Sequence, residues 1–239
     1  MKPPKLNQLS TELVAEFTSD NTVPIREWYV DDSVISVDHL YHISNIEYLR
    51  NMARHRQTNY YGETDGWLYQ ALDQFPIKNL NVLIVGSIMP WYESIVLEYG
   101  CHSCTVVEYR KQNMPVDGVT YIQPHELCGN TFDAVLSISS YEHDGLGRYG
   151  DPLNPNGDIV AMSDIRKYIK PNGLMFLAVP VGRDEIIWNV HRVYGRKRIL
   201  QLIDGWNLVG KYGITDEIWD TPYTDNCPAQ PVLVLRLPA

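Results

Sequence analysis

Hydrophobic and polar positions alternate in a regular pattern from about residue 80 to the end of the chain. Seven short apolar runs recur there, bounded by turn residues and often separated by segments with apolar side chains at helical spacing. Short apolar runs between turns are typical of buried strands. The predicted strands are residues 81–85, 105–108, 119–122, 132–138, 174–179, 206–212 and 232–237. Strands that alternate with helices predict an α/β fold, with a Rossmann-like, doubly wound and mostly parallel sheet of about seven strands.

Residues 1–79 show a different pattern, with helix and loop but no strand alternation. Apolar positions at helical spacing predict helices at residues 44–56 and 67–75, and further helices at 91–100, 158–169 and 196–203. We therefore expect two units: an N-terminal helical cap at residues 1–79 and a Rossmann-like domain at residues 80–239.

Composition and charge narrow the class of protein. The 239 residues are 44% hydrophobic and 21% charged, which excludes a disordered chain or a coiled coil. A net charge of -9 argues against broad binding to nucleic acid or to anionic membranes. No apolar run approaches the length of a membrane span, so we expect a soluble, cytoplasmic protein. Cys101 and Cys104 form the one C-x-x-C, and without a second pair we expect packed thiols there.

The end of the first predicted strand carries a ligand-binding signal. Gly86 and Ser87 follow this strand, and Glu108 ends the next strand 22 residues after the glycine. In nucleotide-binding α/β sheets the glycine lets the backbone approach the ligand, and an acid about 20 positions later accepts hydrogen bonds from ribose hydroxyls. The loop continues to Pro90 and Trp91 with one glycine instead of three. This pattern favours a ribose-bearing ligand without a pyrophosphate.

Four segments in the correct order resemble the class I S-adenosylmethionine-dependent methyltransferases, over residues 80–237. They are residues 82–86, 106–109, 132–137 with 141–143, and 165–177. The two closing strands are similar to the antiparallel hairpin of that family, which implies an antiparallel last strand. The loop at residues 142–158 resembles a methyltransferase-like branch known as domain of unknown function family 268, which carries no established reaction.

The resemblance implies that S-adenosylmethionine is the cofactor and S-adenosylhomocysteine its product. By position, the first loop contacts the methionine part, Glu108 binds the ribose and Tyr109 stacks near the adenine. Ser139 lies under the sulfonium, and Tyr61 closes over it as a cation–π partner. The residues assigned to the cofactor are Val85, Gly86, Ser87, Glu108, Tyr109, Ser139 and Tyr61.

The loop at residues 142–158 is the expected place of catalysis, because it follows a strand end that faces the ligand crevice. Methyl transfer to a hydroxyl needs a base, and a histidine suits this role because its unperturbed pKa is about 6.5. His143 is the preferred base, with Asp144 or Glu142 orienting it. His191, beyond the fifth strand, is the second candidate.

Polar and aromatic side chains of the same two loops are expected to bind the acceptor. They are Glu142, Arg148, Tyr149, Asp151, Trp188 and Arg192. Flat apolar faces beside bidentate donors suit a carbohydrate. Asp144, Asp151 and Asp158 could instead hold a divalent cation on a substrate diol, but Asp158 reads more simply as a helix N-cap, and a metal is not favoured.

We therefore expect an S-adenosylmethionine-dependent methyltransferase that methylates a hydroxyl of a small polar molecule, such as a sugar or glycan. One alternative is a non-catalytic scaffold or sensor that has lost cofactor binding, and another is a nucleotide-sugar enzyme that binds its ribose through Glu108. The sequence leaves open whether the chain forms a homodimer.

Overall fold

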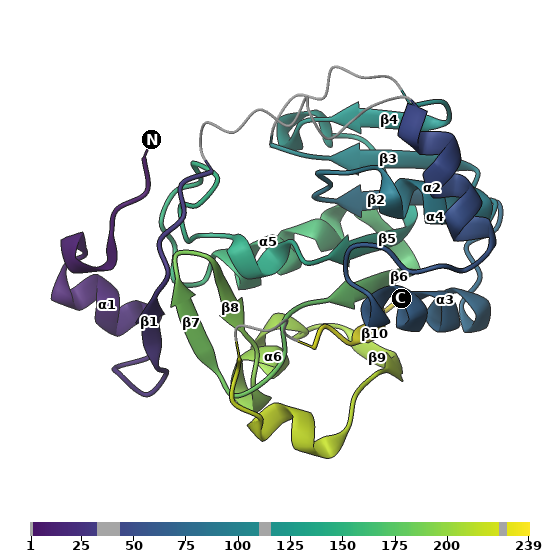
Figure 1. Ribbon diagram of the computed structural model, residues 1–239. Coiled ribbons are helices and arrows are strands. Elements are labelled where there is room, and N and C mark those ends of the chain that lie inside the picture. Colours follow the sequence, from purple (N-terminus) through teal and green to yellow (C-terminus); the bar gives the residue numbers. More distant parts are fainter. Residues whose placement is uncertain (1, 33–43, 110–115, 225–228) are drawn as a thin grey trace.

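The computed structural model describes residues 2–32, 44–109, 116–224 and 229–239, and its centre is a seven-stranded sheet (Figure 1). The strand order is β4-β3-β2-β5-β6-β10-β9. β10 runs antiparallel to both of its neighbours, while the pairs from β4 to β6 are parallel. The strands are β2 (Asn81–Val85), β3 (Ser103–Val107), β4 (Val119–Ile122), β5 (Phe132–Ile138), β6 (Ile169–Ala178), β9 (Asn207–Tyr212) and β10 (Val232–Arg236). The predicted sheet, including its antiparallel last strand, is confirmed.

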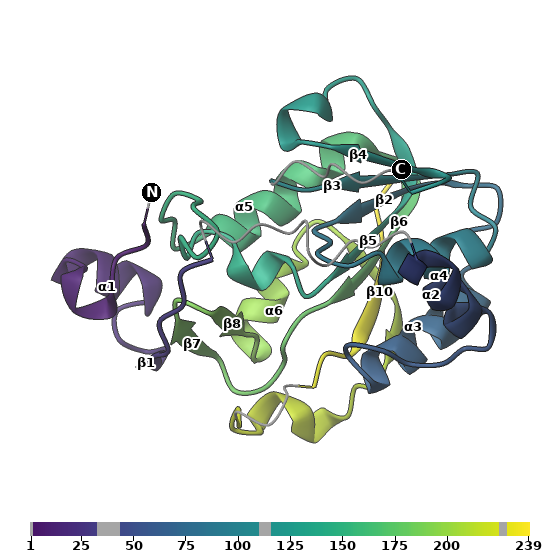
Figure 2. The same cartoon turned by 45° about the horizontal axis from the view of Figure 1, so that its top comes forward.

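Helices cover both faces of this sheet. Alternate residues of one strand point to opposite faces, so Val82 and Ile84 pack on one side and Leu83 on the other. The first side carries α2 (Ser44–Arg54), α3 (Glu63–Gln74) and α4 (Trp91–Glu98), as Figures 1 and 2 show. The second side carries α5 (Gly157–Asp164), the 3₁₀ turn η5 (Ile165–Tyr168) and α6 (Arg196–Leu202). This two-sided packing confirms the doubly wound architecture.

A second sheet of three short strands was not expected from the sequence. It has the order β1-β7-β8, formed by β1 (Ile25–Glu27), β7 (Glu185–Trp188) and β8 (His191–Val193). The short helix α1 (Thr11–Phe17) lies beside it, where the ring of Phe17 meets the indole of Trp188 edge-on at 5.1 Å. The elements of residues 1–79 thus pack in two places, α1 and β1 against β7 and α2 and α3 against the main sheet. The division at residue 79 stays a prediction.

The turn expected at residues 170–173 lies inside β6 as an irregularity of the sheet. Ile169 pairs with Phe132 and Leu174 with Ala134, so four residues of β6 face a single residue of β5. Asn172 adopts a left-handed conformation there, with φ of 65°. The described residues also form the 3₁₀ turns η1 (Leu6–Gln8), η3 (Pro124–Glu126), η4 (Tyr141–His143) and η6 (Asp216–Asp220).

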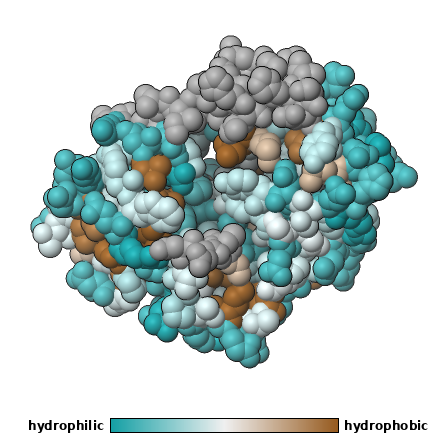
Figure 3. Space-filling model, viewed as in Figure 1, coloured by the Kyte–Doolittle hydropathy of each residue, from teal (hydrophilic) through white to brown (hydrophobic). Residues whose placement is uncertain are grey.

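The parallel strands end at one edge of the sheet, and this edge faces the small sheet (Figure 1). The space-filling view shows the surface hollowed near its centre, between the main sheet and the part that carries β1, β7 and β8 (Figure 3). In the described part of the chain, no helix has the length and apolarity needed to cross a membrane.

Candidate functional site

The ends of β2 and β5 approach each other closely at Gly86. This residue has φ of 73°, and a Cβ atom on it would lie 2.6 Å from Oγ of Ser140. Only a glycine combines this conformation with this approach. The predicted glycine loop and the serines after β5 therefore line the same spot, directly beyond Val85.

Glu108, at the end of β3, reaches back to the loop after β2. Its carboxylate accepts hydrogen bonds from the backbone N–H of Ser87 at 3.2 Å and of Tyr109 at 2.8 Å. The Ser87 hydroxyl donates to the buried Glu93 of α4 at 2.6 Å. The Tyr109 ring is 59% exposed at the rim. The structure thus brings together the residues predicted for the ribose and the first loop.

Glu142 forms the centre of a buried polar group beyond β5. Its side chain is fully buried, and its Oε1 accepts the hydroxyl proton of Ser139 at 2.5 Å. The Tyr61 hydroxyl also contacts Ser139, and burial raises the pKa of Tyr61. Burial raises the pKa of Glu142 to about 7, against the lowering effect of Ser139. The predicted cofactor residues Ser139 and Tyr61 therefore meet the predicted acceptor residue Glu142.

His143 has a defined tautomer. Its Nδ1 lies 2.6 Å from the carbonyl oxygen of Val190. A carbonyl only accepts, so Nδ1 carries the proton and Nε2 presents its lone pair, 3.7 Å from Oε1 of Glu142. Burial and the nearby Arg148 lower the pKa of His143 to about 3. The imidazole is thus neutral at physiological pH, with an accepting nitrogen beside a buried carboxyl, but burial makes it a weaker base than the pKa of about 6.5 expected from the sequence.

His191 lies on β8 behind His143, and the two ring centroids are 6.4 Å apart. The ring of Tyr223 meets it edge-on at 5.2 Å. Burial and Arg148 lower the pKa of His191 to about 4, and its buried Nε2 has no hydrogen-bond partner among the described residues. The two candidate bases therefore share one environment, but the Val190 carbonyl fixes the tautomer of His143 alone.

Arg148 and Tyr149 stand at the edge of this group. The Arg148 guanidinium donates to Asp32 at 2.6 Å and lies over the Tyr149 ring, 5.0 Å from its centroid. Tyr149 in turn meets the His143 ring edge-on at 5.4 Å. The structure places both residues next to the preferred base; their role in binding an acceptor stays a prediction.

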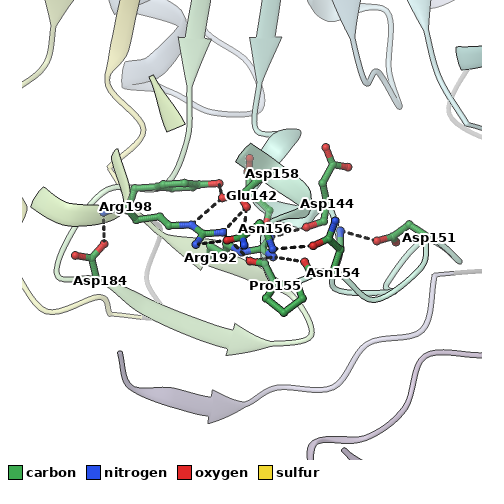
Figure 4. Close-up of polar contacts among 12 residues, drawn as sticks. Glu142, Asp144, Asp151, Asn154, Pro155, Asn156, Asp158, Asp184, Arg192 and Arg198 are labelled. Atoms are coloured by element: carbon green, nitrogen blue, oxygen red, sulfur yellow. Dashed lines mark hydrogen bonds and ion pairs between the residues drawn. The ribbon is translucent and has the colours of Figure 1, made fainter. Parts of the chain in front are cut away.

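Arg192 has a different role from the predicted one. Its guanidinium donates to the carbonyl oxygens of Asp144, Asn154 and Pro155 and lies 3.6 Å from Asp158 (Figure 4). The side chain is only 3% exposed, its two Nη atoms donate to these carbonyl oxygens, and its Nε faces Asp158 without a hydrogen bond to any described residue. Arg192 thus holds the loop at residues 142–158 in shape instead of facing a substrate.

The prediction that Asp158 caps a helix was wrong. Asn156 precedes α5, and the Asp158 carboxylate is buried with Arg198 at 2.5 Å and the Tyr194 hydroxyl at 3.0 Å. The reason is electrostatic: a buried carboxylate needs cationic partners, and two arginines of the β8–α6 segment supply them.

The three aspartates proposed for a cation point to different partners. Asp151 accepts the backbone N–H groups of Gly145 at 2.8 Å and Gly147 at 3.1 Å, and so shapes the loop. Burial raises the pKa of Asp144, which lies apart from Asp158 in Figure 4. Within the described ranges no three acidic, histidine or cysteine side chains are close enough to hold a metal ion.

Trp188 and the C-x-x-C lie away from the crevice. The Trp188 indole is fully buried in the small core beside Phe17 and donates to the carbonyl oxygen of Pro4 at 3.1 Å. This burial corrects its assignment to the acceptor site. Cys104 is buried in β3, and burial raises the pKa of Cys101 to about 11.

Comparisons with known proteins agree with this architecture. Residues 79–221, more than half of the chain, match the family model described as "Caenorhabditis protein of unknown function, DUF268". The chain belongs to the DUF268 family. No curated protein matches it.

Solved structures of methyltransferases resemble this DUF268 chain in fold. The 1,6-didemethyltoxoflavin-N1-methyltransferase of Burkholderia thailandensis, with bound 1,6-didemethyltoxoflavin and S-adenosylhomocysteine, is 14% identical with a TM-score of 0.57. The match covers 99% of this chain and 94% of that protein. N-methyltransferase NodS from Bradyrhizobium japonicum WM9, in complex with S-adenosyl-l-homocysteine, is 13% identical over 80% of this chain and 99% of its own, with a TM-score of 0.49. At 14% identity, the match to the Burkholderia thailandensis enzyme shows the fold alone, a class I methyltransferase fold.

Sequence reasoning missed several residues that the DUF268 structure places at the site. Gln230, before β10, donates to Ser139 at 3.4 Å. Asn189 accepts the backbone N–H of Val30 at 2.9 Å, while its own amide nitrogen has no partner within the described ranges. Asp32 accepts a hydrogen bond from Arg148, and the ring of Tyr223 meets that of His191 edge-on. Neither spacing nor composition marks these residues, because loops far apart in the chain bring them together.

Proposed function

We propose that this DUF268 protein is an S-adenosylmethionine-dependent methyltransferase that methylates a hydroxyl of a small polar molecule, with His143 as the base. The observation that carries the proposal is the tautomer of His143: the Val190 carbonyl holds its Nδ1 proton, which leaves Nε2 as an acceptor beside the crevice. The methyltransferase fold supports the cofactor, and the position beyond β5 supports the role of the base.

The residues at the strand ends fit the cofactor. Glu108 lies at the end of β3, where the ribose hydroxyls need an acceptor. Glu142 has a fully buried oxygen, Oε2, without a hydrogen-bond partner in the described part of the chain. Ser139 donates to its other oxygen, Oε1, and Tyr61 lies near the carboxyl. S-adenosylmethionine supplies the activated methyl group when it is bound; the residues named here bind and orient.

His143 would remove the proton of the acceptor hydroxyl. Its neutral imidazole accepts the proton at Nε2, and the carbonyl of Val190 and the nearby carboxylate of Glu142 stabilise the imidazolium. Because the pKa of Glu142 is raised to about 7, this carboxylate is formed above that pH. We therefore expect turnover to rise as the pH passes through about 7.

We assign the chemical class of the acceptor from the side chains around His143. Neutral imidazoles, the Arg148 guanidinium and the rings of Tyr149 and Tyr223 offer hydrogen bonds and flat faces, which suit a sugar or glycan hydroxyl. A nucleotide-sugar enzyme is a weaker alternative, because the loop after β2 has one glycine for a pyrophosphate.

One observation favours the non-catalytic scaffold as a second candidate. The Glu108 carboxylate accepts backbone N–H groups of Ser87 and Tyr109, so it also orders the loop by itself. A scaffold of this kind would bind neither S-adenosylmethionine nor its product.

Calorimetric titration with S-adenosylhomocysteine, on protein shown by mass spectrometry to be ligand-free, separates the candidates. Saturable micromolar binding, about -8 kcal/mol, is expected for the methyltransferase, with loss of binding in Glu108→Ala. Glu217→Ala, which removes an exposed carboxylate of η6, is the matched control and keeps the affinity. No binding by the folded wild type at millimolar ligand would overturn the proposal in favour of the scaffold.

A further inference from the structure

Glu142 carries a buried oxygen for which the described protein provides no partner. The side chain is fully buried, Oε1 accepts from Ser139, and Oε2 has no hydrogen-bond partner. The basic side chains nearby have other partners: Arg148 pairs with Asp32 at 2.6 Å, and Arg192 binds loop carbonyls and Asp158. A buried carboxyl oxygen without a partner is costly, so its presence points to a ligand.

The position of this oxygen favours the cofactor over the acceptor as the ligand that it binds. Glu142 follows Ser139 and Ser140, and Ser140 lies directly against Gly86, the glycine of the first loop. Tyr61 and Tyr149 are close to the carboxyl on other sides. The carboxyl is therefore linked through Ser139 to Ser140, the residue that lies against Gly86 of the loop after β2.

We infer that Glu142 binds the α-ammonium group of the cofactor's methionine part through Oε2. This inference rests on the proposed function and deepens it. An ammonium brings a positive charge and three N–H donors, whereas a neutral sugar hydroxyl brings no charge to a buried carboxylate. Oε1 stays with Ser139 and faces His143, so one carboxyl serves both the ammonium and the base.

Proton linkage follows from this pairing. An ammonium binds the ionised carboxylate, so protonated Glu142 must release its proton, and affinity for the cofactor rises with pH until Glu142 is ionised at about pH 7. The charged and titratable groups around Glu142 are His143, Tyr141, Tyr61, Asp144, Arg148, Tyr149, Asp158, Arg192 and Tyr194. The pKa of His143 lies at about 3, so it does not titrate in this range.

The test compares two probes in calorimetric titrations of the wild type and Glu142→Gln. S-adenosylhomocysteine carries the ammonium group, and 5′-methylthioadenosine lacks the whole amino-acid part. We expect Glu142→Gln to weaken S-adenosylhomocysteine roughly 10- to 100-fold, as for a charged hydrogen bond, and to leave 5′-methylthioadenosine unchanged. Asp133→Asn is the matched control, because Asp133 lies at the start of β5, the strand that precedes Glu142, and binds Asn81 and Lys170 at the opposite end of that strand.

The pH dependence gives a second readout on the wild type and does not depend on the folding of a variant. Affinity for S-adenosylhomocysteine should fall on acidification below about pH 7 while that for 5′-methylthioadenosine stays constant, and Ser139→Ala should move the fall to higher pH because Oε1 loses its donor. Equal weakening of both probes, or unchanged affinity of Glu142→Gln, would overturn the inference. Wild-type protein that binds neither probe would instead overturn the proposed function.

Discussion

Two polar clusters meet at the strand ends and are similarly buried, yet their pairing differs. In the closed cluster, formed by Asp158, Arg192, Tyr194 and Arg198, each charge faces an opposite charge. In the open cluster, formed by Glu142, His143 and His191, Oε2 of Glu142 and Nε2 of His191 have no hydrogen-bond partner among the described residues. In the closed cluster only Nε of Arg192 makes no hydrogen bond to a described residue, and it still faces the carboxylate of Asp158 at 3.6 Å. The sequence features of the two are alike, with acids beside arginines or histidines. The difference teaches that burial alone does not mark a site; what sets Glu142 apart is a buried carboxyl that has no cationic partner among the described residues.

The clusters are also physically joined. Arg192 of the closed cluster donates to the backbone carbonyl oxygens of Glu142 at 3.4 Å and Asp144 at 2.6 Å. The paired charges thus fix the backbone that presents the unpaired groups. A rigid, satisfied support beneath a reactive group is what catalysis by positioning requires.

The largest expected effect is on turnover, in the open cluster. His143→Gln removes the accepting nitrogen and should lower single-turnover methyl transfer to an acceptor found by screening about 10²- to 10⁴-fold. Affinity for S-adenosylhomocysteine should stay within about twofold, because His143 faces the acceptor in our proposal. His191→Gln is the matched variant: a larger loss of turnover there than in His143→Gln would assign the base to His191.

The next effect is on stability, in the closed cluster. Arg192→Met leaves Asp158 buried with one arginine fewer and frees the loop carbonyls, so the free energy of unfolding should fall by about 3–5 kcal/mol. Urea denaturation measures this change. Lys167→Met is the control, since it breaks an exposed pair with Asp164 and should leave the transition where it was. Equal midpoints for wild type and Arg192→Met would contradict the structural role.

The main sheet could be predicted because its signals are local. Alternation along residues 81–85 sends Val82 and Ile84 to one face and Leu83 to the other, and the spacing of Gly86 and Glu108 belongs to one strand–helix–strand unit. Each of these signals lies within a short window of sequence. The strand ends, and with them the place of the site, follow from the same pattern.

The rest depends on contacts between distant segments. β1 has three residues and pairs with β7 about 160 positions later, as in Ile25 with Ile186. No periodicity in the sequence predicts such a pairing. Trp188 reads as a carbohydrate platform until α1 and Pro4 cover it. In the sequence Arg192 looks like a hydrogen-bond donor to a substrate, but in the structure it donates to loop carbonyl oxygens. The sequence shows which groups are polar, but it does not show which remain unpaired.

The pH dependence of stability should show how much the buried groups of the open cluster destabilise the folded state. Burial lowers the pKa of His191 from 6.5 to about 4. Between these two pH values His191 is protonated in the unfolded chain but neutral in the folded chain, so the free energy of unfolding falls on acidification. Between about pH 5 and about pH 6, the wild type should lose about 1.4 kcal/mol per pH unit more than His191→Gln in urea denaturation.

Glu142 acts with the opposite sign, because its raised pKa stabilises the fold at low pH and this contribution is lost as the pH rises through about 7. Both proteins in the comparison contain Glu142, so its contribution cancels. Parallel stability curves for wild type and His191→Gln would show that His191 takes up its proton equally well in the folded state.

The smallest effect separates a carboxylate that shapes a loop from one that pairs with charges. Asp151 binds backbone N–H groups only: one oxygen accepts from Gly145 and Gly147, and the other from Tyr149 at 3.3 Å. Asp151→Asn keeps one oxygen, so it should lose only the long bond to Tyr149, about 1 kcal/mol in urea denaturation. Asp151→Ala removes all three bonds and should cost more. If Asp151→Asn instead proved as damaging as Arg192→Met, Asp151 would belong with the closed cluster, its negative charge and not its geometry being what the loop requires.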